Sequence, residues 1–434
     1  MANPLNETHD PARRSFVESA NAPDTDFPIQ NLPYCVFRPN ATAPLRVGVG
    51  IGDQILDVGA AGPSLGGPAP EVARTGMAPF LNPLMSLGPQ AWSDLRLGLS
   101  RALSAGSGNR VSQHLTPMAQ ADIRLPVAFR NFTDFYASVF HATNAGRAFR
   151  PDNPLLPNYK YVPVAYHSRA SSVRVSGTPV KRPRGQRKDA SEAVPSYEPS
   201  RNMDFELELG IFVGTPTDLG TTVPISRAAE HVFGFCLLND WSARDVQAWE
   251  YQPLGPFLGK NFATTISPWI VTREALAPFR TAAFARPDGD PEPLPHLDDA
   301  DDRAQGGLDI TLEAYFLTEA MRNSATPPFR ITQTSFALIY WTMAQMIAHH
   351  TSNGCNLEIG DLIGSGTVSG PDKSSWGSLL ELTARGREPI ELPGGETRGF
   401  IEDGDEIIFR GFCAKPGYPR IGFGECRAAI LPAD

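Results

Sequence analysis

Short apolar runs, broken by glycine, proline or asparagine, extend over most of this chain. The 39 glycines and 41 prolines among 434 residues indicate frequent turns, so most of these runs are predicted to be strands. Alternating apolar residues within 28–58 predict a small antiparallel unit, which we expect to be a barrel-like N-terminal domain over residues 27–122. Residues 123–434 predict a large mixed β domain. The predicted fold class is therefore mostly β.

Two helices are expected to interrupt these strands. Apolar residues share one face of the segment 93–105, and Asn82 is placed to cap a single turn before it. A longer periodic stretch predicts a helix over 334–350, with Thr332 or Thr334 as its N-cap. Residues 1–26 are polar and lack periodicity, so we expect an irregular segment that packs loosely on the rest of the chain.

Charge and cysteine usage exclude several classes of protein. The net charge is −9 and no run of lysine or arginine is large enough for a nucleic-acid surface, so no nucleic-acid partner is expected. No apolar stretch is long enough to span a membrane, and the N-terminus lacks an apolar signal core. Five cysteines without C-x-x-C spacing favour reduced thiols over a disulfide framework or a zinc knuckle. We therefore expect a cytoplasmic protein with no membrane partner.

The segment 239–269 holds the densest group of functional side chains. If residues 240–247 form a helical turn, Asp240, Arg244 and Gln247 lie on one face. A solvated helical ion pair is the alternative interpretation. Large rings interleaved with the charges favour a pocket wall instead, and these are Trp241, Trp249, Tyr251 and Phe257.

Carboxylates form a second pattern. Glu206 and Glu208 alternate within the strand predicted over 204–213, so both point to the same face. On an exposed face water alone would screen their repulsion, whereas a buried face requires a positive charge between them. Together with Asp134 and Asp240 they offer four carboxylates to a hard cation such as Mg²⁺ or Ca²⁺.

His141 and Glu381 complete the candidate chemistry. A histidine among aromatic residues is usually structural, but beside a bound cation His141 is a natural general base. Glu381 is a lone acid in the apolar run 378–382, predicted as a strand, and such an acid needs a partner when buried. The glycine-rich segment 364–370 lacks the G-x-G-x-x-G spacing, so a tight loop lining a pocket is expected there.

Several sequence blocks, in one order, resemble a known family. They are TDFY with HATN, YHSRASSVRVSGTPV, ELELGIFVG, LLNDWSARDVQAWEYQPLGPFLGKNFATTISPW, YWTMAQMIAHHTSNGCNLEIGDLIGSGTVSGP and IGFGEC. Over nearly its whole length the chain resembles the two-domain form of the fumarylacetoacetate hydrolase family. This resemblance implies an SH3-like barrel for the N-terminal domain and a mixed β-sandwich roll for the large C-terminal domain.

The resemblance also implies roles for individual residues. The primary metal ligands would be Asp134, Glu206, Glu208 and Asp240. A second cation site is implied at Asp240, Lys260 and Thr264, where Lys260 can offer only its backbone carbonyl because an ammonium group has no lone pair. The implied substrate-binding residues are Tyr136, Arg150, Tyr166, Arg244, Gln247, Tyr251 and Thr367. The implied catalytic residues are His141, Glu381, Arg244, Gln247 and Lys260. Ala165 and Ser168 stand where the family typically has glycine, which leaves the shape of the pocket open.

The implied activity is hydrolysis of the carbon–carbon bond of 4-fumarylacetoacetate to fumarate and acetoacetate, the last step of tyrosine and phenylalanine catabolism. In this scheme His141, oriented by Glu381, activates water, and a bound Mg²⁺ or Ca²⁺ holds the departing unit as an enolate. The family also implies a homodimer. Two alternatives remain at this point: a hydrolase or decarboxylase of a related acylpyruvate or β-keto acid, and a non-catalytic cation-binding β protein.

Overall fold

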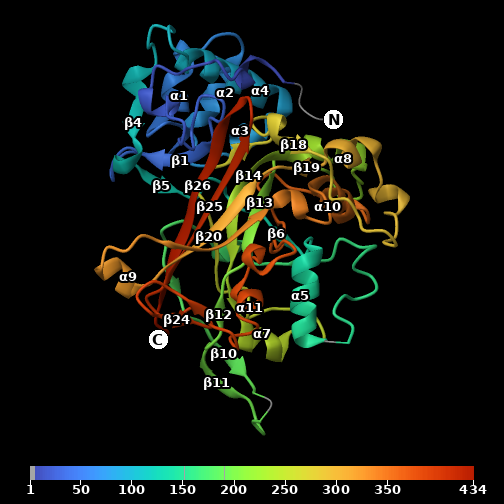
Figure 1. The fold of residues 1–434 in the computed structure, drawn as a ribbon. Coiled ribbons are helices and arrows are strands. Elements are labelled where there is room, and N and C mark those ends of the chain that lie inside the picture. The colour runs from blue at the N-terminus through green and yellow to red at the C-terminus, as the bar shows by residue number, and fades with distance from the viewer. Residues whose placement is uncertain (1–4, 151, 190) are drawn as a thin grey trace.

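The computed structural model describes residues 5–150, 152–189 and 191–434. Two large sheets form the framework of the C-terminal domain, and the N-terminal domain combines one five-stranded sheet with several helices (Figure 1). The predicted fold class is confirmed. Within the described ranges no helix is long and apolar enough to cross a membrane. The cysteines are free thiols, and all except Cys355 are buried.

The N-terminal domain is a curled antiparallel sheet with the strand order β4-β3-β2-β1-β5. Its strands are β1 (Tyr34–Arg38), β2 (Arg46–Ile51), β3 (Gln54–Asp57), β4 (Leu115–Pro117) and β5 (Asp122–Arg124). The connection from β3 to β4 contains α1 (Val58–Ala61), α2 (Ala69–Ala73), α3 (Asn82–Met85) and α4 (Gly88–Leu103). Leu95 and Leu99 of α4 are buried in the same core as Val49 of β2.

The central sheet of the large domain has the strand order β7-β6-β22-β13-β14-β16-β8, and β17 pairs with β14 beside this path. The strands are β6 (Phe132–Phe135), β7 (Ala165–His167), β8 (Val173–Val175), β13 (Leu207–Val213), β14 (Val232–Asp240), β16 (Thr264–Ile266), β17 (Val271–Thr272) and β22 (Leu362–Gly364). The pairs β6–β22 and β8–β16 are parallel, and the other pairs are antiparallel.

A second sheet has the order β21-β20-β25-β26-β9, and the long strands β25 and β26 reach up to the N-terminal domain (Figure 1). Its strands are β9 (Val180–Lys181), β20 (Thr311–Leu317), β21 (Phe329–Ser335), β25 (Glu406–Lys415) and β26 (Tyr418–Leu431). Leu209 of β13, Phe316 and Phe409 meet in the core between the two sheets. The other face of the central sheet, with Phe212 and Leu238, packs against the N-terminal domain.

Smaller elements complete the large domain. Its short strand pairs are β10 (Arg184–Arg187) with β11 (Ser196–Pro199), β12 (Met203–Asp204) with β15 (Ser242–Ala243), β18 (Arg280–Thr281) with β19 (Gly307–Leu308), and β23 (Ile390–Glu391) with β24 (Thr397–Arg398). Its helices are α5 (Val139–Phe149), α6 (Ile225–Ala228), α7 (Arg244–Glu250), α8 (Ala300–Gln305), α9 (Glu319–Asn323), α10 (Met343–Thr351) and α11 (Leu379–Leu382).

The helix predicted over 334–350 is wrong in its first half. Thr332 and Thr334 belong to β21, which pairs with β20, so neither residue caps a helix. The α-helix begins only after Thr342, which forms a reciprocal capping box with Gln345. Strand pairing therefore overrides an apolar spacing that is compatible with a helix.

Two predictions for the N-terminal part also need correction. The helix α4 begins at Gly88 instead of residue 93, and Asn82 is not a cap but binds the backbone of Ala128 through both ends of its amide. Residues 5–26 do not pack loosely, because Thr8 and His9 are buried and His9 Nε2 lies 2.8 Å from the carbonyl oxygen of Glu274. Residues 1–4 lie outside the described residues.

Candidate active site

The register of the central sheet brings candidate residues side by side. Asp134 of β6 lies opposite Tyr166 of β7 and Gly364 of β22, while Asp240 of β14 lies opposite Thr264 of β16. Antiparallel pairing of β13 with β22 and β14 places Glu208 between these two groups. Side chains that are far apart in the sequence therefore lie at the same end of neighbouring strands.

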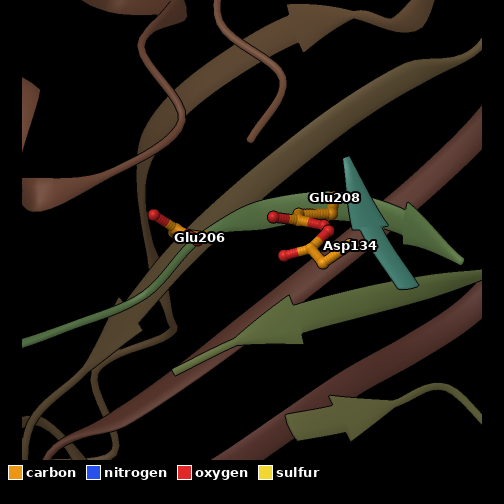
Figure 2. A group of neighbouring side chains, drawn as sticks. All are labelled: Asp134, Glu206 and Glu208. Atoms are coloured by element: carbon orange, nitrogen blue, oxygen red, sulfur yellow. The ribbon is translucent and has the colours of Figure 1, made fainter. Parts of the chain in front are cut away.

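Asp134, Glu206 and Glu208 form a buried acidic cluster (Figure 2), with one ligand oxygen from each lying within 4.8 Å of the others. Their exposed fractions are 2%, 6% and 0%, so the alternative in which water screens Glu206 and Glu208 on an open strand face is wrong. Figure 2 shows the carboxylates of Asp134 and Glu208 pointing toward each other from β6 and β13. Buried carboxylates this close repel one another and require a positive charge.

The protein itself neutralises this cluster only in part. Burial, followed by repulsion from neighbouring carboxylates, raises the pKa of both Asp134 and Glu208 well above the usual values. Among the described residues, Asp134 Oδ1 and Glu208 Oε1 have no hydrogen-bond partner. Gly364 leaves room beside them, since a Cβ there would lie 2.3 Å from Asp134 Oδ1. Unpartnered carboxylate oxygens around open space fit a hard divalent cation.

Lys260 supplies positive charge on the other side of the cluster. Its ammonium group contacts Glu206 and lies 2.8 Å from Asp240 Oδ2. Burial alone would raise the pKa of Glu206, but Lys260 and Arg244 outweigh this effect and lower it to about 2. The Lys260 side chain thus points to the acidic cluster, whereas at the second cation site the resemblance implied its backbone carbonyl.

Asp240 is not one of the three clustered carboxylates, but Lys260 joins it to Glu206. It accepts hydrogen bonds from Tyr166 Oη at 2.8 Å and from Thr264 Oγ1 at 3.0 Å, besides the contact with Lys260. The predicted helical turn over 240–247 is wrong, because Asp240 ends β14 and α7 begins at Arg244. Burial also rules out a solvated ion pair between these two residues.

His141 and Glu381 form a buried pair. The Nδ1 atom of His141 lies 2.7 Å from Glu381 Oε2, and its Nε2 atom lies 3.8 Å from Glu206 Oε1. An ionised carboxylate only accepts hydrogen bonds, so the proton in the contact with Glu381 lies on Nδ1, and Nε2 faces the acidic cluster. Burial opposes ionisation of Glu381, but the contact with His141 outweighs it and lowers the pKa.

Three further side chains hold Glu381, and none was singled out from the sequence. Ser369 and Ser378 hydroxyls donate to Oε2, and the Asn144 amide donates to Oε1. Glu381 lies in the helical turn α11 rather than in the predicted strand, with Ser378 as the N-cap. The spacing Ser-x-x-Glu at 378–381 is a helix-start signal that could have revealed this arrangement.

Arg244 connects the acidic cluster with α7. Its guanidinium group lies 2.8 Å from Asp204 and 2.9 Å from Glu206, and it donates to the Gln247 side chain at 3.1 Å. Burial would lower the pKa of Arg244, but Asp204 and Glu206 together raise it above its usual value. Arg244 is therefore a fixed cation beside the acidic cluster.

These groups surround a cavity of about 430 Å³. Predicted residues that line it are Asp134, Tyr136, His141, Arg150, Tyr166, Glu206, Glu208, Arg244, Gln247, Tyr251, Lys260 and Thr367. Three predicted residues do not line the cavity themselves. Asp240 contacts the lining residue Tyr166, Thr264 contacts Asp240, and Glu381 contacts the lining residue His141. Arg150 Nε has no hydrogen-bond partner among the described residues, so its guanidinium group can receive an anionic ligand. Ala165 also lines the cavity, near Tyr166.

Family models match both parts of the chain. Residues 30–126 match "Fumarylacetoacetase N-terminal", and residues 130–431 match "Fumarylacetoacetate (FAA) hydrolase C-terminal". The chain belongs to the fumarylacetoacetate hydrolase family. Fumarylacetoacetase of Bos taurus is 47% identical over 431 residues, covering 96% of this chain and 99% of that protein. Fumarylacetoacetase of Caenorhabditis elegans is 46% identical over 430 residues, covering 97% and 100%.

A solved structure with this fold is the fumarylacetoacetate hydrolase from psychrophilic Exiguobacterium antarcticum. It superposes with a TM-score of 0.50 at 16% identity, covering 92% of this chain and 99% of that one. The predicted family membership is confirmed by these matches. The two fumarylacetoacetases match 96% and 97% of this chain, so the similarity includes the N-terminal domain.

Proposed function

We propose that this protein hydrolyses the carbon–carbon bond of 4-fumarylacetoacetate, giving fumarate and acetoacetate. The observation that carries the proposal is the buried pair of His141 and Glu381 beside the acidic cluster, in a chain that matches fumarylacetoacetases over nearly its full length. A non-catalytic cation-binding protein would not need a histidine held by a carboxylate at this position. This alternative is therefore not favoured.

Asp134, Glu206 and Glu208 fit a divalent cation, and we propose Mg²⁺ or Ca²⁺, which prefer oxygen ligands. Asp240 would take part as a further primary ligand, and a second site at Asp240, Lys260 and Thr264 remains a proposal. When bound, the cation supplies Lewis-acid stabilisation of the oxygens of the departing acetoacetate unit.

His141 would act as the general base. Its Nε2 lone pair takes a proton from water, whose oxygen attacks the carbonyl carbon next to the bond that breaks. The carbon–carbon bond electrons leave with the acetoacetate unit, which takes a proton at carbon, and the attacked carbonyl becomes a fumarate carboxylate. Glu381 keeps the ring in this tautomer and stabilises the imidazolium ion that forms.

The remaining polar groups would bind charge that develops or already exists on the substrate. Arg244, Gln247 and Lys260 lie where they could stabilise the tetrahedral oxyanion. Arg150 suits a terminal carboxylate, because a guanidinium group binds carboxylates through two parallel hydrogen bonds. Lining residues with hydroxyl groups would complete substrate binding, and these are Tyr136, Tyr166, Tyr251 and Thr367.

A substrate panel tests the proposal against its rival within enzymes. Purified protein with added Mg²⁺ or Ca²⁺ is assayed for cleavage of fumarylacetoacetate, an acylpyruvate and a simple β-keto acid. We expect the highest kcat/KM for fumarylacetoacetate. A higher kcat/KM for the acylpyruvate, or decarboxylation of the β-keto acid without hydrolysis, would assign the site to another reaction.

Assembly and location are further proposals. We propose a homodimer, because strands at sheet edges need cover and family members resembling this chain pair through the large domain. Light scattering that shows only a monomer at micromolar concentration would reject it. A cytoplasmic location and the absence of nucleic-acid or membrane partners stay predictions, which cell fractionation and binding assays would check.

A further inference from the structure

Asp204 is a buried carboxylate that does not line the cavity. It ends β12, its exposed fraction is 0%, and the described residues donate four hydrogen bonds to it. Oδ1 accepts from the backbone of Phe205 at 2.8 Å and of Leu379 at 2.7 Å. Oδ2 accepts from Arg244 Nε at 2.8 Å and from the backbone of Leu380 at 3.0 Å. Each carboxylate oxygen thus accepts one hydrogen bond from the segment 379–380 and one from another part of the chain.

These contacts join two parts of the site that are far apart in the sequence. On one side is the Arg244 guanidinium group, which also contacts Glu206. On the other side are Leu379 and Leu380, the first two residues of α11, and the next residue is Glu381, which holds His141. The Asp204 carboxylate therefore lies between the Arg244 guanidinium group, which is proposed to stabilise the oxyanion, and α11, which orients the proposed base His141 through Glu381.

We propose that Asp204 is a positioning residue that sets the placement of Arg244 relative to the His141–Glu381 pair. This inference rests on the proposed function, because it assumes that water activation and oxyanion stabilisation occur at these two places. Asp204 itself touches no substrate, since it lies behind Arg244 and α11 and outside the cavity lining. Its effect should therefore appear in kcat more than in KM.

The chemistry of the contacts explains why even asparagine cannot replace Asp204. All four groups that meet the carboxylate are N–H donors. The amide of asparagine would turn an NH₂ group toward at least one pair of these donors, because only one of its two side-chain atoms accepts hydrogen bonds. Either Arg244 or the start of α11 must then move, and Arg244 also loses a buried counter-charge.

Asp405 offers a matched control. It is also buried, at 1% exposed, and accepts hydrogen bonds from Arg398 Nε at 2.8 Å and from the backbone of Glu402 at 2.9 Å. Among the described contacts, Asp405 touches neither Arg244 nor Glu381, and it does not line the cavity. Asp405→Asn thus removes the same kind of buried pair without touching the proposed link.

The test compares Asp204→Asn, Asp405→Asn and the parent protein for kcat, KM, bound Mg²⁺ and thermal unfolding. For Asp204→Asn we expect kcat to fall roughly 10- to 100-fold, as for other residues that orient a catalytic group, while KM and bound Mg²⁺ change little. Asp405→Asn should lower the unfolding temperature but leave kcat within about threefold of the parent. Equal kcat for the two variants would overturn the proposal.

A double variant tests the link itself. If Asp204 acts through α11, Asp204→Asn should reduce kcat much less in a Glu381→Gln background than in the parent, whereas fully additive losses would contradict this role. If Asp204→Asn does not fold, Asp204→Glu keeps the charge beside Arg244 but displaces it by one methylene. We then expect low kcat with retained folding, and parental kcat would show that charge alone suffices. Absence of turnover in the parent would instead reject the proposed function.

Discussion

The His141–Glu381 pair allows the sharpest prediction. Replacing His141 with alanine removes the proposed base but leaves the acidic cluster intact, since His141 Nε2 lies 3.8 Å from Glu206 and is not needed as a ligand. A positioned general base contributes roughly 10² to 10⁴ in rate, so kcat should fall by that factor. KM and bound metal should stay close to the parental values.

Glu381→Gln should lose activity for an electrostatic reason. The Glu381 carboxylate lies 2.7 Å from His141 Nδ1, which puts the centres of the two charges roughly 4 Å apart once the ring is protonated. At an effective dielectric constant near 20, this attraction is about 4 kcal/mol. Its complete loss would slow the reaction about 10³-fold, which is an upper limit because glutamine can still accept one hydrogen bond.

The assay follows the loss of fumarylacetoacetate for both single variants and the double variant, together with bound metal. The two losses should not multiply, because Glu381 acts only through His141. His231→Ala is a suitable control, since His231 is also buried but bonds only the backbone of Thr215 in the contacts described for its ring. If His141→Ala stays within about threefold of the parent, His141 is not the base. If bound metal is lost instead, His141 is a ligand.

Three other variants address the surrounding charges. Asp134→Asn should stabilise the metal-free protein, because the raised pKa of Asp134 means that its ionised form opposes folding at neutral pH, by about 1.4 kcal/mol for each pKa unit. Thermal unfolding in the presence of a chelator should show this gain in stability. Added Mg²⁺ should stabilise only the parent protein. Lys260→Met should lower the free energy of unfolding by about 3–5 kcal/mol, because Glu206 and Asp240 lose a buried cation, and an unchanged denaturant midpoint would contradict this. Arg150→Ala should raise KM by about tenfold or more through loss of charge-assisted hydrogen bonds, with kcat less affected, and an unchanged KM would place the substrate carboxylate elsewhere.

Local patterns predicted the parts of the site that lie on regular strands. Glu206 and Glu208 were predicted to share one face from the two-residue period of a β-strand, and both carboxylates do join the acidic cluster. The strand predicted over 204–213 is wrong at its start, however, because β13 begins at Leu207 and Glu206 lies just before it. Their burial did not follow from this pattern, because it depends on β22 and on Asp134, which pair with or lie beside them only in the folded sheet. The choice between a water-screened face and a cation site therefore required the structure.

Tertiary partners decided the elements that the sequence predicted wrongly. The apolar spacing within 334–350 suits a helix, but pairing with β20 extends residues 329–335 and the capping box at Thr342 sets the true helix start. Glu381 lies in a short helical turn because the side chains of Ser378 and Asp204 satisfy its first backbone N–H groups. A contact between residues 204 and 380 leaves no periodic signal in the chain.

One titration tests the central claim most directly. Metal-free protein is titrated with Mg²⁺ and, separately, with Ca²⁺, while the heat of binding and the rate of fumarylacetoacetate cleavage are followed on the same samples. We predict that binding and turnover rise together and saturate at the same metal concentration, and that neither occurs in Asp134→Asn. Full cleavage activity in verified metal-free protein, or saturable binding without any cleavage, would contradict the proposed metal-assisted hydrolysis.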